Sequence, residues 1–97
     1  MPLLTCIMDR RDKFEIIADI LAVVDKEGPL YKTSIAGKSN LDSRMLEKYM
    51  DIMLDAGLIA KVKDEPRLFT ITDKGRYYLH LYRSIRSMLL HYRFSTY

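Results

Sequence analysis

Several kinds of residue are scarce in this chain of 97 residues. It has a single cysteine, Cys6, together with three prolines, four glycines and no tryptophan. One cysteine cannot form an internal disulfide, and a small domain without disulfides is typical of a reducing compartment. We therefore expect a cytoplasmic protein that is stabilised by an apolar core, since 48% of its residues are hydrophobic and 30% are charged.

The chain also lacks long apolar runs. None approaches the roughly 20 residues that a membrane-spanning helix requires. The first eight residues are apolar, but they have neither the basic leader nor the small-residue cleavage site of a signal peptide. The sequence predicts one small domain that is neither secreted nor inserted into a membrane.

Acidic residues are missing from the end of the chain. None follows Asp73, whereas four arginines do. The net charge of +3 hides this asymmetry, because residues 1–56 hold 8 basic and 10 acidic side chains while residues 57–97 hold 8 and 3. An uncompensated positive field favours an anionic partner.

Apolar residues recur every three or four positions between residues 12 and 26. This spacing predicts an amphipathic helix with Phe14, Ile17 and Leu21 on its buried face. Its first residue, an aspartate, can cap the helix, and the pair Gly28-Pro29 ends it.

Two further helices are predicted in the middle of the chain. A short one covers residues 30–38 and is followed by a polar turn, and a longer one covers residues 42–56. Asp42 can cap the longer helix, and Gly57 is placed to end it in a left-handed conformation.

The hydrophobic period then changes. Residues 58–63 and 67–71 alternate around the turn Asp64-Glu65-Pro66, which predicts a two-stranded hairpin. A final helix is expected from Asp73 to about Phe94, capped by the threonine before it and roughly 33 Å long.

This order of elements is typical of a winged helix-turn-helix with a long C-terminal helix. The predicted fold class is mostly α with a small β-hairpin (α+β), in which residues 1–75 form the winged-helix domain and residues 76–97 a dimerisation helix continuous with it. In that arrangement the second helix of the pair enters the DNA major groove, and the hairpin reaches the backbone or the minor groove.

The last helix carries two apolar rows. Tyr78, Leu81, Ile85, Met88 and Tyr92 recur with heptad spacing. A second row consists of Leu79, Tyr82, Leu89 and Leu90. One row can cover its own domain and the other then needs a second copy, although the whole helix could also pack on one monomer. The predicted dimer interface comprises Tyr78, Leu81, Tyr82, Ile85, Met88, Leu89 and Tyr92.

Hydroxyl and basic side chains gather around the helix-turn-helix and the hairpin. Such groups at helix starts suit phosphate oxygens. The candidate DNA-contact residues are Lys32, Thr33, Ser34, Lys38, Ser39, Ser43, Arg44, Glu47, Lys48, Lys61, Lys63 and Arg67. The alternative for any one of them is a solvated charged surface.

Glu47 is an unusual member of this set, because the predicted reading helix holds more acidic than basic residues. Its carboxylate could accept a hydrogen bond from a cytosine amino group. Alternatively, it pairs with Arg44 or Lys48 on a solvated face.

No catalytic, cofactor or metal site is predicted, and no small-molecule substrate is evident. Gly37-Lys38-Ser39 imitates the end of a phosphate-binding loop, but Lys32 stands where its first glycine would be. His80 and His91 lie on different helix faces without ligands at metal-binding spacing. We therefore expect that the protein is not an enzyme.

Several short strings carry a resemblance to a known family. They are Lys32-Thr33-x-Ile35, Asn40-Leu41, Leu46, Tyr49-Met50, Met53, Gly57-Leu58-Ile59 and Thr72-x-x-Gly75. Over Phe14 to about Ile85, the sequence resembles the archaeal winged-helix family of small DNA-binding proteins. Its members include chromatin-associated proteins of Sulfolobus that dimerise through a C-terminal antiparallel coiled coil.

The resemblance implies a homodimer that binds double-stranded DNA as a transcription regulator or chromatin protein, with no cofactor. The family pattern does not require the first eight residues, and Leu3, Leu4 and Ile7 either extend the first helix or cover the dimer seam. The alternative function is a winged-helix module that binds another protein and not DNA.

Overall fold

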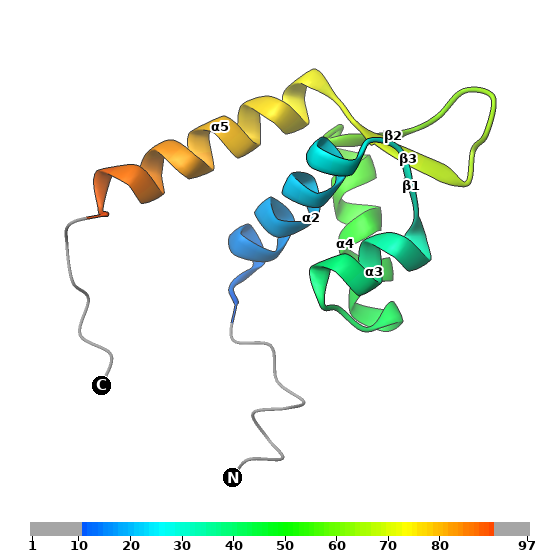
Figure 1. Ribbon diagram of the computed structural model, residues 1–97, viewed down its shortest axis with the longest axis horizontal. Helices are drawn as coiled ribbons and strands as arrows, with labels where there is room; N and C mark the ends of the chain where they lie inside the picture. Colours follow the sequence, from blue (N-terminus) through cyan, green and yellow to red (C-terminus); the bar gives the residue numbers. More distant parts are fainter. Residues whose placement is uncertain (1–10, 91–97) are drawn as a thin grey trace, which may run out of the picture.

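A computed structural model of the chain describes residues 11–90, and Figure 1 shows how their elements are arranged. The elements are α2 (Lys13–Glu27), β1 (Leu30–Tyr31), α3 (Lys32–Ser39), α4 (Ser43–Ala56), β2 (Ile59–Lys61), β3 (Leu68–Ile71) and α5 (Asp73–Met88). Helices α3 and α4 form the helix-turn-helix, and the β2–β3 hairpin is called the wing below. The predicted α+β winged-helix fold is confirmed.

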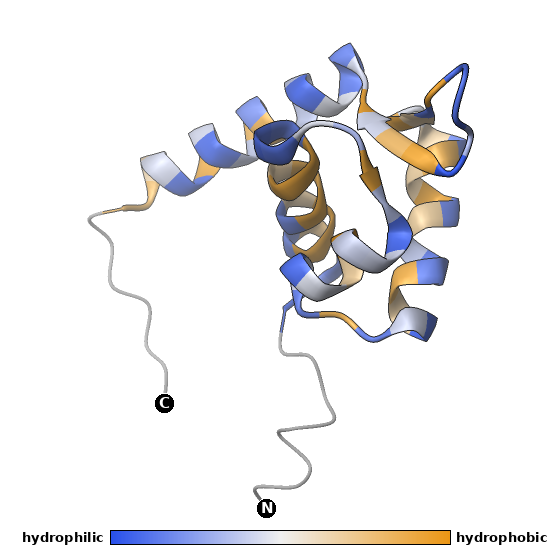
Figure 2. Cartoon of the chain, turned by 45° about the vertical axis from the view of Figure 1, so that its right-hand side comes forward, coloured by the Kyte–Doolittle hydropathy of each residue, from blue (hydrophilic) through white to orange (hydrophobic). Residues whose placement is uncertain are grey.

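Helix α2 supplies the centre of the core. Asp12 caps it as predicted, with its carboxylate accepting a hydrogen bond from the Glu15 amide at 2.8 Å. Six of its residues are buried, and they lie against α3, α5 and β3. Figure 2 shows the hydrophobic side of α2 and the contrasting hydrophilic loop of the wing.

The prediction that Phe14 lies on the buried face of α2 is wrong. Its side chain is 61% exposed. The buried stripe centres on Ile17, Ile20 and Val24, which leaves Phe14 at the edge of the stripe on the first turn of the helix.

The turn between α3 and α4 and the ends of α4 follow from local chemistry. Asn40 adopts a left-handed conformation with φ 57°, which asparagine tolerates better than most residues. Asp42 caps α4 by accepting a hydrogen bond from the Met45 amide at 2.7 Å, and Gly57 ends it with φ 77°. Both predicted boundaries of α4 are confirmed to within one residue.

The sheet has three strands, whereas the sequence predicts only a two-stranded hairpin. Its order is β1-β3-β2, with both pairs antiparallel. Leu30 and Tyr31, which fall within the predicted short helix, pair instead with Phe69 and Leu68 of β3. A two-residue strand shows no alternation, and its residues could equally begin a helix, so sequence spacing alone cannot reveal it.

Helix α5 is tied to the end of α4. The Thr72 hydroxyl donates to the Gly57 carbonyl at 2.6 Å and accepts from the Gly75 amide at 3.0 Å, which caps α5 as predicted. Lys74 Nζ donates to the Ala56 carbonyl at 2.7 Å. The start of α5 is thereby fixed, and its other end extends away from the remaining helices (Figure 1).

Helix α5 is shorter than the predicted span to Phe94. Its last helical residue is Met88, and the amides of Leu89 and Leu90 then bond to carbonyls three residues back, at Arg86 and Ser87. Such bonds tighten a final turn and commonly end a helix without a glycine. The predicted end of the helix lies outside the described residues, and so does Tyr92, which is predicted to contact the second copy. The same holds for His91 and for Leu3, Leu4, Cys6 and Ile7. Within residues 11–90, no helix is long and apolar enough to cross a membrane.

Candidate nucleic-acid interface

Two open grooves meet at the start of α3. The first, which we call the α3–α4 groove, has a volume of about 660 Å³ and is lined by Lys32, Thr33, Ala36, Ser43, Arg44, Leu46 and Glu47. The second, the wing groove, has a volume of about 480 Å³ and lies between α4, β1 and the wing. Because Lys32 and Thr33 line both grooves, they form one continuous face.

This face brings together seven of the twelve candidate DNA-contact residues. Lys32, Thr33, Ser43, Arg44 and Glu47 line the α3–α4 groove. Lys32, Thr33, Lys61 and Arg67 line the wing groove, whose floor is apolar and includes Met50 and Phe69. Residues from two helices and the wing, separated by up to 35 positions in the sequence, therefore converge as the helix-turn-helix layout requires.

The other five candidates line neither groove. Lys48 and Lys63 are exposed, and the Lys48 ammonium lies 5.9 Å from the centre of the Tyr49 ring. Ser34 is half-buried. Ser39 is only 4% exposed and its Oγ has no hydrogen-bond partner, so burial removes it from any phosphate.

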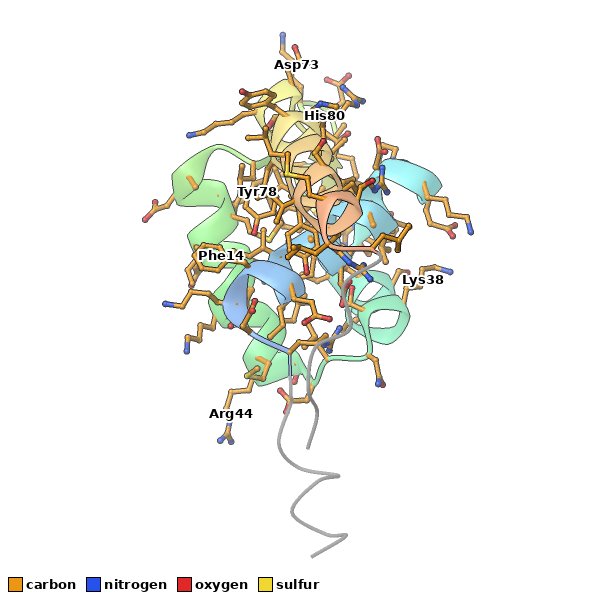
Figure 3. All side chains as sticks on the ribbon, turned by 90° about the vertical axis from the view of Figure 1, so that its left-hand side faces the viewer. Phe14, Lys38, Arg44, Asp73, Tyr78 and His80 are labelled. Atoms are coloured by element: carbon orange, nitrogen blue, oxygen red, sulfur yellow. The ribbon has the colours of Figure 1, made fainter. Side chains whose placement is uncertain are left out.

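Lys38 lies on another side of the molecule. Its Nζ is 4.0 Å from a carboxylate oxygen of Glu27 at the end of α2. Figure 3 shows Lys38 and Arg44 far apart, on opposite sides of that view. Lys38 therefore does not share a face with the α4 side chains.

Glu47 is paired, but with neither of the partners considered from sequence. The Lys32 ammonium donates to both of its carboxylate oxygens, at 2.6 and 2.7 Å. The spacing within α4 suggests Arg44 as a neighbour on the same helix. The actual partner is Lys32, the first residue of α3. It lines the same groove as Glu47.

The cation of Arg67 is held in the loop of the wing, immediately before β3. Its Nε lies 3.4 Å from a Glu65 carboxylate oxygen. Its guanidinium also lies 6.0 Å from the centre of the Tyr31 ring. The pairing of β1 with β3 is what brings Tyr31 to this position.

Arg11 is a positioning residue that the sequence does not indicate. Its Nη1 donates to Asp19 Oδ2 at 2.7 Å and to the Ser39 carbonyl at 3.0 Å. Its Nη2 donates to the Asn40 carbonyl at 3.3 Å. These bonds tie the turn before α4 to α2, and no local signal could reveal them because the partners are 28 and 29 positions away.

The predicted dimer residues fall into two groups. Tyr78 and Tyr82 are half-buried against the core of their own domain. Leu81, Ile85, Met88 and Leu89 are exposed, Ile85 by 57% and Met88 by 80%. The end of α5 therefore presents an apolar surface that the described residues do not cover.

Tyr78 links α5 to α2, away from the grooves. Its hydroxyl donates to the Phe14 carbonyl at 2.8 Å, and Figure 3 shows both residues. Burial, followed by the charges of Tyr82 and Asp12, raises the pKa of Tyr78 from 10.0 to about 12. Burial likewise raises the pKa of Tyr82.

The described residues offer little for metal chemistry. Residues 11–90 contain no group of three or more His, Cys, Asp or Glu side chains that could hold a metal ion. His80 is exposed on α5. The face formed by the two grooves presents cations, hydroxyls and two carboxylates, those of Glu47 and Asp51, instead.

The comparisons with known proteins agree with this architecture. The family model for the winged helix-turn-helix matches residues 10–90. An uncharacterized protein of Methanocaldococcus jannaschii is 39% identical over 67 residues, which cover 69% of this chain and 65% of that protein.

Solved structures show the same fold at low sequence identity. RV1404 from Mycobacterium tuberculosis matches with a TM-score of 0.69 and 16% identity, covering 77% of this chain and 54% of that one. A MarR family transcriptional regulator from Silicibacter pomeroyi matches with a TM-score of 0.64 and 20% identity, covering 82% and 58%. The chain thus spans less than two thirds of the length of these proteins.

Proposed function

This chain belongs to the winged helix-turn-helix family, and from that premise we propose that it is a homodimeric double-stranded DNA-binding protein. It acts as a transcription regulator or chromatin-associated protein, with α4 in the major groove and the wing on the backbone. The Silicibacter pomeroyi protein of similar fold is a MarR family transcriptional regulator, which supports this class of function.

The observation that carries the proposal is the convergence of unpaired cations on one face. Arg44 and Lys61 line the two grooves, and neither forms an ion pair with any residue in 11–90. The major groove is about 12 Å wide and accepts one helix. With α4 in that groove, Arg44 and Ser43 on its first turn face base edges or phosphates, and Lys61 reaches the flanking backbone.

The exposed apolar end of α5 supports the homodimer. Leu81, Ile85 and Met88 lie on one side of the helix, because they are spaced by four and three residues. A second copy that pairs along this side removes them from water. Two reading helices would then be set roughly 34 Å apart, one turn of DNA.

Salt titration of duplex binding tests the proposal. The logarithm of the binding constant falls linearly with the logarithm of the salt concentration, and each phosphate neutralised by a cation adds about 0.9 to the steepness of that slope. Arg44→Gln and Lys61→Gln should each reduce that slope by about 0.9. Lys38→Gln is the matched control: it removes the same charge from the side facing Glu27 and should leave the slope unchanged.

Two results would contradict the proposal. One is the absence of duplex affinity at about 50 mM salt, which would favour a module that binds another protein. The other is an equal loss of slope in all three variants, because the affinity would then reflect overall charge and not this face.

A further inference from the structure

The pair formed by Lys32 and Glu47 occupies the middle of the proposed DNA-binding face. Both carboxylate oxygens lie within 2.7 Å of the Lys32 ammonium. By contrast, Arg67 and Lys38 lie 3.4 and 4.0 Å from their acidic partners. The side chains of Lys32 and Glu47 are 46% and 52% exposed, so the contact is open to solvent and to a ligand.

The position of Lys32 is suited to an anion. It is the first residue of α3, and the first turn of that helix contains no acidic residue and no side-chain cap. The positive end of a helix and an ammonium group together attract phosphate. Glu47 reaches this position from α4 and supplies the negative charge.

We propose that Glu47 is a specificity-determining residue whose carboxylate holds Lys32 in place of a DNA phosphate. When a phosphate takes Lys32, Glu47 is released into the major groove, where it accepts a hydrogen bond from a cytosine amino group. The inference rests on the proposed function, because it requires α4 to lie in the major groove.

The exchange links a backbone contact to base identity. In the major groove guanine presents only acceptors, and thymine presents an acceptor and a methyl group. Adenine presents an amino donor beside the N7 acceptor, which repels a carboxylate, whereas cytosine presents its amino donor alone. A released carboxylate facing acceptors is repelled and returns to Lys32, which then loses its phosphate. Cytosine at this position stabilises the released state, so the protein makes one more phosphate contact on a matching site.

The strength of the pair suits such an exchange. An exposed ion pair shifts an equilibrium by only about 1.4- to 5-fold. A DNA phosphate can therefore displace the carboxylate, and the carboxylate still weakens binding to non-matching DNA by a measurable factor.

The first experiment measures binding of the full chain to a random-sequence duplex. Glu47→Gln frees Lys32 and should raise the affinity up to about 5-fold at low salt, with a slope steeper by about 0.9. Asp55→Asn is the matched control, since Asp55 is an exposed acidic residue on the same helix, lines neither groove and has no ion pair among residues 11–90. It should raise affinity less and leave the slope unchanged.

A Lys32→Gln background shows whether the gain passes through the pair. There the gain from Glu47→Gln should disappear, while the effect of Asp55→Asn persists. If Glu47→Gln gives the same gain with or without Lys32, the carboxylate acts only by general repulsion and the inference is overturned.

The second experiment selects duplexes from a randomised pool. The unaltered chain should enrich cytosine at one position of its site, and Glu47→Gln should lose that preference. The same preference in both chains overturns the inference while leaving the proposed function intact. Failure of the proposed function looks different, because the unaltered chain would then bind no duplex at about 50 mM salt.

Discussion

Helices α2 and α5 are nearly equal in length, with 15 and 16 residues, but they are used differently. Helix α2 buries six apolar residues inside the domain. Helix α5 buries only Gly75 and Leu79 and exposes most of its remaining apolar side chains. Both helices show apolar residues at helical spacing, so this spacing identifies a face that needs covering but not the molecule that covers it.

The reason lies in the position of the two helices. Helix α2 runs through the middle of the fold and contacts α3, α5 and β3. Helix α5 packs on the domain through its first turns and then extends away from it (Figure 1). Its first half therefore contributes to the core, and we propose that its second half contributes to a dimer.

The strongest test of this contrast truncates one apolar side chain on each helix. Leu21 is fully buried, and Leu21→Ala should lower the free energy of unfolding by about 2–5 kcal/mol through lost contacts and a cavity. Ile85→Ala should change it by less than about 0.5 kcal/mol at concentrations where the chain is monomeric, since Ile85 is exposed. Urea denaturation measures both.

Sedimentation of an Ile85→Glu variant completes that test. A charge in the proposed seam should shift the chain from dimer to monomer without unfolding it, and remove the concentration dependence of its melting temperature. If the unaltered chain sediments as a monomer at all concentrations, the apolar end of α5 does not form a homodimer.

A second test concerns the first turn of α5. A Cβ at Gly75 would overlap the Leu58 carbonyl oxygen and crowd Ile71 Cγ1 at 2.8 Å. Gly75→Ala should therefore destabilise the fold by about 1–3 kcal/mol. Gly37→Ala is the control, since no atom lies within 4 Å of a Cβ there, and it should stabilise α3 by up to about 1 kcal/mol.

A melting experiment on these two glycine variants decides the point. Opposite shifts in melting temperature support the assignment of the start of α5 to the core. If Gly75→Ala is as mild as Gly37→Ala, α5 is free to move away from β3, and the division of the helix into two halves is wrong.

The sequence predicts features that depend on neighbouring residues and misses features that depend on distant ones. The caps at Asp12, Asp42 and Thr72 are confirmed because each cap bonds an amide three residues further on. Strand β1 is missed, since it exists only through its pairing with β3.

The same distinction applies to the candidate site. The order of the elements predicts which helix and wing residues line the two grooves. The contacts of Arg11 with the turn and of Lys32 with Glu47 cannot, since they join residues at least 15 positions apart. The sequence does not indicate that Ser39 is buried, because the short α3 has a weak apolar pattern that does not show which side faces inward.

The smallest expected change in stability concerns the hydrogen bond that joins α5 to α2. Tyr78→Phe removes the bond to the Phe14 carbonyl and should cost about 0.5–1.5 kcal/mol. It should also change the alkaline behaviour, because the pKa of Tyr78 is raised from 10.0 to about 12 in the folded chain.

The direction of that change follows from the neutral phenol being favoured in the folded state. Below pH 10 this contribution to stability is fully present, and it is lost as the pH rises from about 10 to 12, where the unfolded chain ionises first. Tyr78→Phe should therefore flatten the decline in stability over this range, and remove the latest component of the tyrosine absorbance titration. A Tyr31→Phe control, which alters an exposed tyrosine at the wing groove, should leave that latest component in place. If both variants lose the same component, Tyr78 is not held against α2, and the contact between the two helices ends before this turn.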